Sequence, residues 1–351
     1  MKSVGLFFLA VLDPVPNIPR KIFLAGTKGN LKGNIFSCEM RTNKRVEGKG
    51  IFNYSVFLPT NKTYSSMKIL NTLLIAGLFT FIGTISNFGQ DSNTAKSYIS
   101  LPNMAYGHAP HQRNLVDVYL PKNHSKRTKM VVFIHGGFWT KGSKSQLPKP
   151  LIDLLVGEKS YAMASINYRY VKKDGNKYPT QLEDVGKALQ YLSEKADSLG
   201  YKKNSFALIG ASAGAHLALM QGFSQDPKHW IKTIVDIVGP TDLADPVVRG
   251  RQGIADATIS YFLGNPNADA AIAKEASPIQ FISKKNKIPT IIFHGEQDEL
   301  VDVHQAKNLH QKLLDNGIKT EIVLYPNETH EMKKSLPDVF LRTAGWLEKV
   351  Y

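Results

Sequence analysis

The sequence predicts an α/β domain in which a mostly parallel β-sheet is covered by helices on both faces. Short apolar runs rich in β-branched residues recur along the chain, and amphipathic helical patterns separate most of them. Strands that are apolar throughout are typical of a parallel sheet buried on both sides. The expected strands are residues 115–120, 130–134, 162–167, 206–209, 233–238, 290–293 and 320–324.

Three segments between and after these strands have clear helical spacing. Residues 178–193 place their leucine and valine side chains on one face, with Pro179 near the first turn, where proline is tolerated. Residues 303–314 and 339–350 show the same pattern. In sheets of this kind the functional site lies at the carboxyl ends of the strands. The residues that follow each strand are therefore the first candidates.

The charge and cysteine content exclude several classes of function. The chain has 351 residues, with 44 Lys and Arg against 29 Asp and Glu, a net charge of +15. No run of five basic residues occurs, so the excess indicates a solvated surface and no nucleic-acid partner. The single cysteine, Cys38, excludes a disulfide framework and any metal site that needs two thiolates.

A candidate export signal begins at Met67. Lys68 follows, residues 69–90 carry no charge, and the most apolar stretch is residues 73–82. A basic start followed by a short apolar run is typical of a secretory signal peptide. We therefore expect residues 67–89 to be a signal peptide and the protein to be periplasmic or secreted.

The signal divides the chain into three parts. Residues 1–66 show no sustained period of 2 or 3.6, so we expect an upstream extension without a fold of its own. Residues 90–351 have the length of one α/β domain and form the expected catalytic domain. The alternative is an internal membrane anchor with residues 1–66 on the cytoplasmic side.

The strongest candidate nucleophile is Ser212. The strand at residues 206–209 runs into Gly210-Ala-Ser-Ala-Gly214, and a helix-forming segment follows at once. A G-x-S-x-G sequence between a strand and a helix is typical of a nucleophile elbow, in which small residues let the chain turn sharply below the serine. Small-residue turns also occur for packing alone, so this reading depends on the rest of the site.

A second glycine-containing turn supplies candidate oxyanion donors. The strand at residues 130–134 is followed by His135-Gly-Gly-Phe-Trp139. Acyl transfer needs N–H groups that point at the tetrahedral oxyanion, and glycines let a backbone present them. The expected donors are the backbone N–H groups of Gly137, Phe138 and Ala213.

The candidate acid is Asp298. It stands in the first turn after the strand at residues 290–293, with room to face inward. Glu296, Glu299 and Asp302 are rivals within four residues, and Asp302 is the next choice.

The candidate base is His330, in the turn after the last strand. The order Ser, Asp, His along the chain is the one expected for an elbow nucleophile. In this reading His330 takes the proton of Ser212 and later returns it to the leaving group, while Asp298 fixes the imidazole tautomer. Four other histidines are expected to have structural or exposed positions. His216 would pack in the helix after Ser212, His294 would brace a strand end, and His304 and His310 would lie on the exposed face of a helix.

From about residue 115 onward the chain resembles the α/β-hydrolase superfamily. It is similar to the carboxylesterase group that includes hormone-sensitive-lipase-like and feruloyl or acetyl-xylan esterases. The motifs occur in the family's order, and they are Leu115-Val-Asp-Val-Tyr-Leu-Pro121, His135-Gly-Gly-Phe-Trp139, Ser165-Ile-Asn-Tyr-Arg169, Gly210-Ala-Ser-Ala-Gly-Ala-His-Leu-Ala218, Gly239-Pro-Thr-Asp-Leu243 and His294-Gly-Glu-Gln-Asp298.

The resemblance has one departure and one ambiguity. Phe138 stands where hormone-sensitive-lipase-like enzymes have a third glycine, although a backbone donor does not require glycine. His135-Gly-Gly-Phe-Trp139 followed by Gly142-Ser-Lys144 is also similar to kynurenine formamidases, which use the same triad on an N-formyl amide. Ester and formamide therefore both remain open at this point.

Two features bear on the substrate. Residues 239–287 are longer than a plain crossover, and we expect a small cap insertion there, with an ordinary helix pair as the alternative. Trp139 and Tyr168 are placed by their motifs near the mouth of the site, where they would bind substrate or belong to the core.

The sequence thus predicts a secreted serine hydrolase that cleaves carboxylic esters, with acyl or feruloyl esters on carbohydrate as candidate substrates. No metal or cofactor is expected, the partner is a small-molecule or carbohydrate-linked ester, and no stable membrane partner is expected after signal cleavage. The alternatives are an arylformamidase or peptidase of the same fold, or a non-catalytic hydrolase-fold binding module. The oligomeric state is not predicted.

Overall fold

The computed structural model describes residues 41–42, 52–53, 98–107, 113–226, 228–250, 253–267 and 270–351. The chain divides into two compact units, residues 1–92 and 93–351. In the first unit the described residues form a two-residue antiparallel ladder between β1 (Arg41–Thr42) and β2 (Phe52–Asn53). The expected signal peptide, residues 67–89, lies outside the described residues.

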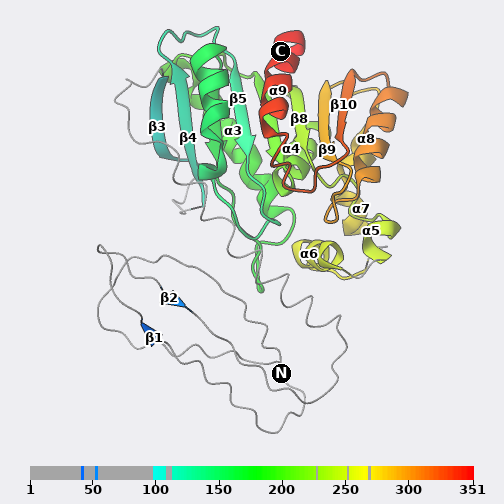
Figure 1. Ribbon diagram of the computed structural model, residues 1–351. Coiled ribbons are helices and arrows are strands. Elements are labelled where there is room, and N and C mark those ends of the chain that lie inside the picture. The colour runs from blue at the N-terminus through cyan, green and yellow to red at the C-terminus, as the bar shows by residue number, and fades with distance from the viewer. Residues whose placement is uncertain are drawn as a thin grey trace. The chain divides into compact units, whose positions relative to one another are not determined.

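The second unit is built on an eight-stranded sheet in the order β10-β9-β8-β7-β5-β6-β4-β3 (Figure 1). The six strands from β10 to β6 run parallel to one another. β4 pairs antiparallel with β6, and β3 pairs antiparallel with β4 at the edge of the sheet. All seven expected strands are present, and β3 is an eighth that the apolar pattern did not predict. Their bounds are β3 Tyr98–Ala105, β4 Leu115–Pro121, β5 Met130–Ile134, β6 Ala162–Ile166, β7 Phe206–Ala211, β8 Ile231–Ile237, β9 Thr290–Gly295 and β10 Thr320–Tyr325.

Helices cover both faces of this sheet, which explains the continuous apolar runs. In β5, Val132 and Ile134 belong to the core under α3, α4 and α8, whereas Val131 and Phe133 belong to the core under α9 and the π-helical turn η2. Both sets are buried. The main helical elements are η2 Asp153–Glu158, α3 Thr180–Leu199, α4 Ala213–Ser224, α8 Val303–Asp315 and α9 Leu336–Val350.

The expected cap insertion is present between β8 and β9. It consists of α5 (Pro246–Gly250), α6 (Ile254–Leu263), α7 (Ala271–Glu275) and the 3-10 turn η3 (Pro278–Phe281). These short helices lie beyond the end of the sheet at which β5 points, next to the start of α8 (Figure 1). The part of the chain that the structure describes includes no helix both long and apolar enough to cross a membrane.

Candidate active site

Ser212 occupies a strained turn between β7 and α4. β7 ends at Ala211, α4 begins at Ala213, and Ser212 itself has φ 52° and ψ −118°. A non-glycine residue rarely adopts a positive φ, and such strain is maintained only where the surroundings impose it. The Ser212 N–H donates to Ile237 O at 2.8 Å, which fixes the turn to β8. The chain therefore reverses within one residue and leaves the hydroxyl at the carboxyl end of the sheet.

The two glycines of the elbow are required by close backbone contacts. A Cβ atom on Gly210 would lie 2.4 Å from Ala215 Cα, and one on Gly214 would lie 2.0 Å from Ile134 O. Both distances are far below a van der Waals contact. The small residues at ±2 from Ser212 are thus explained by the packing of α4 against β7 and β5.

The structure brings Ser212, His330 and Asp298 into one hydrogen-bonded chain. His330 Nε2 lies 2.8 Å from Ser212 Oγ, and His330 Nδ1 lies 2.7 Å from Asp298 Oδ2. With Nδ1 donating to the carboxylate, Nε2 is left as an acceptor for the serine proton. This is the arrangement expected of a nucleophile, its base and the group that orients the base.

The acid is held more firmly than a simple side-chain pair. Asp298 Oδ1 accepts from the backbone N–H groups of Leu300 and Val301, each at 2.9 Å. Burial of Asp298 opposes its ionisation, but hydrogen bonds from His294 and His330 outweigh burial and hold the pKa of the carboxyl well below its usual range. Asp298 is therefore held as a carboxylate, with Oδ1 bound to the loop and Oδ2 shared between His330 and His294.

Backbone contacts fix the acid loop against the loop that carries the base. Gln297 N–H donates to Glu328 O at 3.0 Å, and Glu296 N–H donates to Tyr325 O at 3.0 Å. A Cβ atom on Gly295 would meet Glu328 O at 2.3 Å, so only glycine permits this approach. These contacts set the distance between Asp298 and His330 independently of the side chains.

The expected oxyanion loop has an unusual backbone. Gly137, Phe138 and Trp139 have φ values of 115°, 56° and 57°, three successive positive values. Thr140 and Lys141 N–H groups both donate to Gly137 O, which closes the turn. Among the described residues no hydrogen bond is recorded from the backbone N–H groups of Gly137, Phe138 or Ala213. Phe138 and Ala213 line the same pocket as Ser212, and the oxyanion role of the N–H groups of Gly137, Phe138 and Ala213 stays a prediction.

His135 and its neighbours support this loop from below. Arg113 Nη2 lies 3.2 Å from His135 Nε2, and since a guanidinium only donates, Nε2 is the acceptor and Nδ1–H donates to Gly136 O at 2.7 Å. Burial, aided by the charge of Arg113 and opposed by the bond to Gly136, lowers the pKa of His135 to about 4. His135 is therefore neutral and braces the oxyanion loop.

Tyr168 does not reach the site mouth where the sequence placed it. It is fully buried, stacks on the His135 ring at 4.2 Å and donates its hydroxyl to His135 O at 3.0 Å. It is absent from the residues that line the pocket. Of the two alternatives for Tyr168, substrate binding and a place in the core, the structure shows the core position, beneath the oxyanion loop.

An apolar pocket opens beside Ser212 and His330. It encloses about 470 Å³ of empty volume, including its open mouth. Trp139 lines one wall and is almost fully buried, with its ring stacked on Phe262 of α6 at 4.2 Å. The remaining lining residues come from the oxyanion loop, the start of α4, the segment between β8 and β9, the acid loop and α8. They are Phe138, Ala213, Pro240, Val248, Ala255, Thr258, Ile259, Leu300, Val301 and Gln305.

The other acid and base candidates have different surroundings. Asp302 caps α8 by accepting from His304 N–H at 3.1 Å, and Glu296 is 3.9 Å from Lys307. His216 is buried, with Nε2–H donating to Ala276 O at 2.7 Å. These three side chains thus have partners other than Ser212 and His330.

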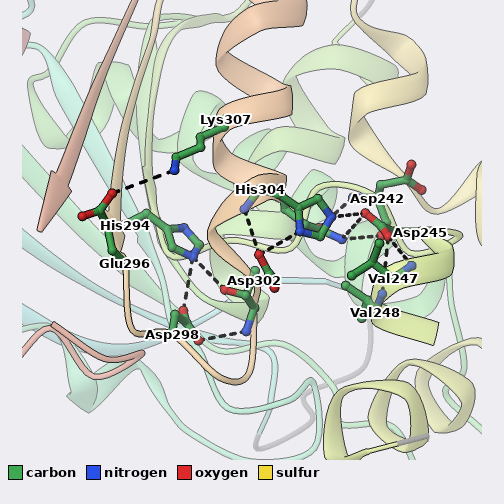
Figure 2. Close-up of polar contacts among 12 residues, drawn as sticks. Asp242, Asp245, Val247, Val248, His294, Glu296, Asp298, Asp302, His304 and Lys307 are labelled. Carbon is green, nitrogen blue, oxygen red and sulfur yellow. Dashed lines mark hydrogen bonds and ion pairs between the residues drawn. The ribbon is translucent and has the colours of Figure 1, made fainter. Parts of the chain in front are cut away.

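Sequence analysis did not predict that His294 contacts Asp298. His294 is fully buried, donates from Nε2 to Val301 O at 2.8 Å and lies 3.3 Å from Asp298 Oδ2 (Figure 2). Asp236 of β8 lies close enough to His294 to affect its ionisation, and burial raises the pKa of Asp236 to about 7. The available signal was a titratable residue within the apolar run of each of two strands, Asp236 in β8 and His294 in β9. Within the described residues no cluster of His, Cys, Asp or Glu has a geometry suited to a metal ion.

Curated relatives of the chain are esterases. Esterase LipC of Mycobacterium tuberculosis is 26% identical over 231 residues, which cover 62% of this chain and 56% of LipC. The isoprenylcysteine alpha-carbonyl methylesterase ICME of Arabidopsis thaliana is 27% identical over 245 residues, which cover 65% of this chain and 55% of ICME. The chain thus spans about half the length of these relatives.

Solved structures with the same fold include a carbohydrate esterase and an acetyl ester-xyloside bifunctional hydrolase. A truncated carbohydrate esterase from gut microbiota aligns with a TM-score of 0.60 and 22% identity, over 72% of this chain and 99% of that one. An acetyl ester-xyloside bifunctional hydrolase from Caldicellulosiruptor lactoaceticus aligns with a TM-score of 0.55 and 20% identity, over 67% and 88%. At these identities the likeness shows the α/β-hydrolase fold. The BD-FAE family profile matches residues 116–313, more than half of the sequence, and the chain therefore belongs to the BD-FAE family, within the carboxylesterase group of the α/β-hydrolases.

Proposed function

We propose that this chain is a serine carboxylesterase that works through an acyl-enzyme. The observation that carries the proposal is the chain of contacts from Ser212 Oγ through His330 to Asp298 Oδ2, placed at the edge of an apolar pocket. The esterase relatives support the same reaction class.

The first half of the reaction acylates Ser212. Oγ attacks the ester carbonyl while His330 Nε2 takes its proton, and the negative oxygen that forms accepts from the N–H groups of Gly137, Phe138 and Ala213. The imidazolium then gives the proton to the departing alcohol oxygen as the carbonyl reforms. Asp298 keeps Nδ1 protonated throughout and stabilises the imidazolium.

Water completes the cycle. His330 Nε2 takes a proton from a water molecule that attacks the acyl-enzyme, and the same oxyanion donors stabilise the second tetrahedral intermediate. Collapse of that intermediate breaks the bond to Ser212 Oγ, which recovers its proton from His330, and releases the carboxylic acid. No group beyond this chain and water is needed to balance the atoms.

The proposed substrates are short-acyl or feruloyl esters carried by carbohydrate. Support comes from the solved structures with the same fold, which include a carbohydrate esterase and an acetyl ester-xyloside bifunctional hydrolase. The segment that resembles formamidases has a structural use here: Gly142 O accepts from Arg113, and Lys144 Nζ pairs with Asp117 at 2.7 Å. These contacts give the segment a structural role, and the esterase relatives favour an ester over a formamide.

A comparison of three substrates tests this function. The kcat/KM values for p-nitrophenyl acetate, methyl ferulate and N-formylkynurenine are measured with wild type and Ser212→Ala. We expect both esters to exceed the formyl amide by ~100-fold or more, about 2.8 kcal/mol of transition-state stabilisation, and Ser212→Ala to be inactive. A preference of that size for the formyl amide would replace the esterase by an arylformamidase.

We further propose export through a signal peptide at residues 67–89. The uncharged run after Lys68 is its support. N-terminal sequencing of the protein from its native host tests this, with a mature start near Gln90 expected. A protein that retains residue 1 would exclude cleavage and favour the membrane-anchored alternative.

A further inference from the structure

His304, near the start of α8, lies between two carboxylates (Figure 2). Its Nδ1 is 2.8 Å from Asp302 Oδ1, and its Nε2 is hydrogen-bonded to Asp245 Oδ2. A carboxylate can only accept, so each ring nitrogen must carry a proton for both contacts to be favourable. The geometry alone therefore describes His304 as an imidazolium bridging two anions.

Both carboxylates also cap helices. Asp302 accepts from His304 N–H at the start of α8, whereas Asp245 Oδ1 accepts from Val247 N–H at 2.7 Å and Val248 N–H at 3.3 Å at the start of α5. The His304 ring thus joins the first turn of α8, which follows the acid loop, to the first turn of the cap.

The elements that His304 joins, the cap helices and the acid loop before α8, form walls of the pocket. Val248 of α5 and Ile259 of α6 line it on the cap side, and Val301 lines it on the side of the acid loop. α5 is tied to α6, because Arg249 Nε lies 2.7 Å from Asp256 Oδ1 and Arg249 Nη2 donates to Ser260 Oγ at 3.1 Å. A change in the position of α5 therefore changes the shape of the pocket beside Ser212.

We propose that His304 is a positioning residue for the acyl pocket: as an imidazolium it holds the cap helices against α8, so selectivity for longer acyl groups depends on its protonation. This rests on the esterase function proposed above. A longer acyl chain contacts more of the pocket wall formed by α5 and α6 than an acetyl group does. It therefore loses more apolar contact, and more binding free energy, when that wall is displaced.

The charged groups around His304 set the direction of the pH response. Asp245 and Asp302 face the ring, while Lys307 is directed to Glu296 one turn further along α8. Partial burial lowers the pKa of His304, but the bonds to Asp245 and Asp302 outweigh burial and raise it above the usual value of 6.5. The bridge is therefore intact below this raised pKa and is lost as pH rises through it.

The ratio of two substrates isolates this effect from the chemistry of the triad. p-Nitrophenyl butyrate and p-nitrophenyl acetate share a leaving group, so the titration of His330 cancels in the ratio of their kcat/KM values, once spontaneous hydrolysis is subtracted. In wild type we expect the butyrate-to-acetate ratio to fall about tenfold between about pH 6 and about pH 9. In His304→Gln we expect the low ratio at every pH.

Two further variants sharpen the test. His310→Gln replaces another histidine of α8, whose Nδ1 faces Thr320 Oγ1 at 3.2 Å instead of a carboxylate, and it should keep the wild-type profile. Asp245→Asn keeps an acceptor for the α5 cap but removes one anion, and it should flatten the pH dependence. A wild-type ratio that does not change with pH, or equal effects of His304→Gln and His310→Gln, would overturn the proposal.

Hydrogen exchange provides a readout that does not depend on ester hydrolysis. The protection factors of the α5 and α6 amides, corrected for intrinsic exchange, should fall about tenfold from about pH 6 to about pH 9 in wild type and should be uniformly low in His304→Gln. Protection that is the same in both proteins at both pH values contradicts the bridge. Absence of activity on both esters would refute the proposed function, while the exchange data would still decide on the bridge.

Discussion

Replacement of Asp298 by asparagine should reverse the tautomer of His330 without disturbing the loop. Asp298 Oδ1 accepts from two backbone N–H groups, at Leu300 and Val301, so the single oxygen of asparagine will take that position. The amide nitrogen then faces His330 Nδ1 and donates to it. Nδ1 becomes the acceptor, Nε2 carries the proton, and the acceptor for the Ser212 proton is lost.

The size of the loss follows from the role of this contact. A neutral imidazole in the wrong tautomer cannot act as the base, and the corresponding replacement in a serine protease triad lowers kcat by ~10⁴-fold, about 5 kcal/mol. We expect a loss of this order for Asp298→Asn in kcat for p-nitrophenyl acetate, with an unchanged circular dichroism spectrum.

Two carboxylates of the same loop serve as controls. Glu296→Gln and Asp302→Asn should each lower kcat by less than ~10-fold, because Glu296 pairs with Lys307 and Asp302 caps α8, whereas Asp298 holds His330. A loss below ~10-fold in Asp298→Asn, or a ~10⁴-fold loss in Asp302→Asn, would refute the assignment of the acid.

Three further replacements test the packing of the site. Asp236→Asn should raise the free energy of unfolding by roughly 2–4 kcal/mol at about pH 8 and little at about pH 4, as measured by urea unfolding. The folded-state pKa of Asp236 is raised to about 7, so the wild-type protein loses stability as pH rises from the unfolded-state pKa to 7, and asparagine removes that loss. Equal gains at both pH values would contradict this. Gly214→Ala should lower the free energy of unfolding by about 3 kcal/mol or more and abolish activity, since the new Cβ would lie 2.0 Å from Ile134 O. Gly186→Ala in α3 is the control: its Cβ would lie 3.6 Å from the nearest atom, so it should be neutral or stabilise the protein by about 1 kcal/mol. Similar melting temperatures for the two variants would be evidence against the elbow packing. Trp139→Ala should lower the free energy of unfolding by about 3–5 kcal/mol, because it removes a buried ring that stacks on Phe262 of α6. An unchanged midpoint of urea unfolding would argue against that contact.

The fold was predictable from sequence because its strands are buried on both faces. Runs such as residues 130–134 are apolar at every position, which distinguishes a parallel sheet from an amphipathic one. β3 was missed for the opposite reason: it is an edge strand with mixed burial, and its polar residues gave no periodic signal. Edge strands depend on pairing with a neighbour, here β4, more than on their own sequence.

The candidate triad was predictable because chain order and strand ends determine it. Gly210, Gly214 and Ser212 form a local motif, and Asp298 and His330 follow successive strands. The roles of Tyr168 and His304 could not be read in this way. Tyr168 is buried by a ring stack with His135, 33 residues away, and His304 meets Asp245 across 59 residues. Contacts of that kind arise from tertiary packing, for which a single sequence carries no local pattern.

The central claim is that Ser212 is the nucleophile, and covalent labelling tests it most directly. The protein is incubated with a fluorophosphonate, digested, and the peptides are analysed by mass spectrometry. We predict one adduct per chain, on Ser212, formed in wild type and absent in a folded Ser212→Ala variant. A folded wild-type protein that remains unlabelled, or one labelled equally after Ser212→Ala, would contradict the account.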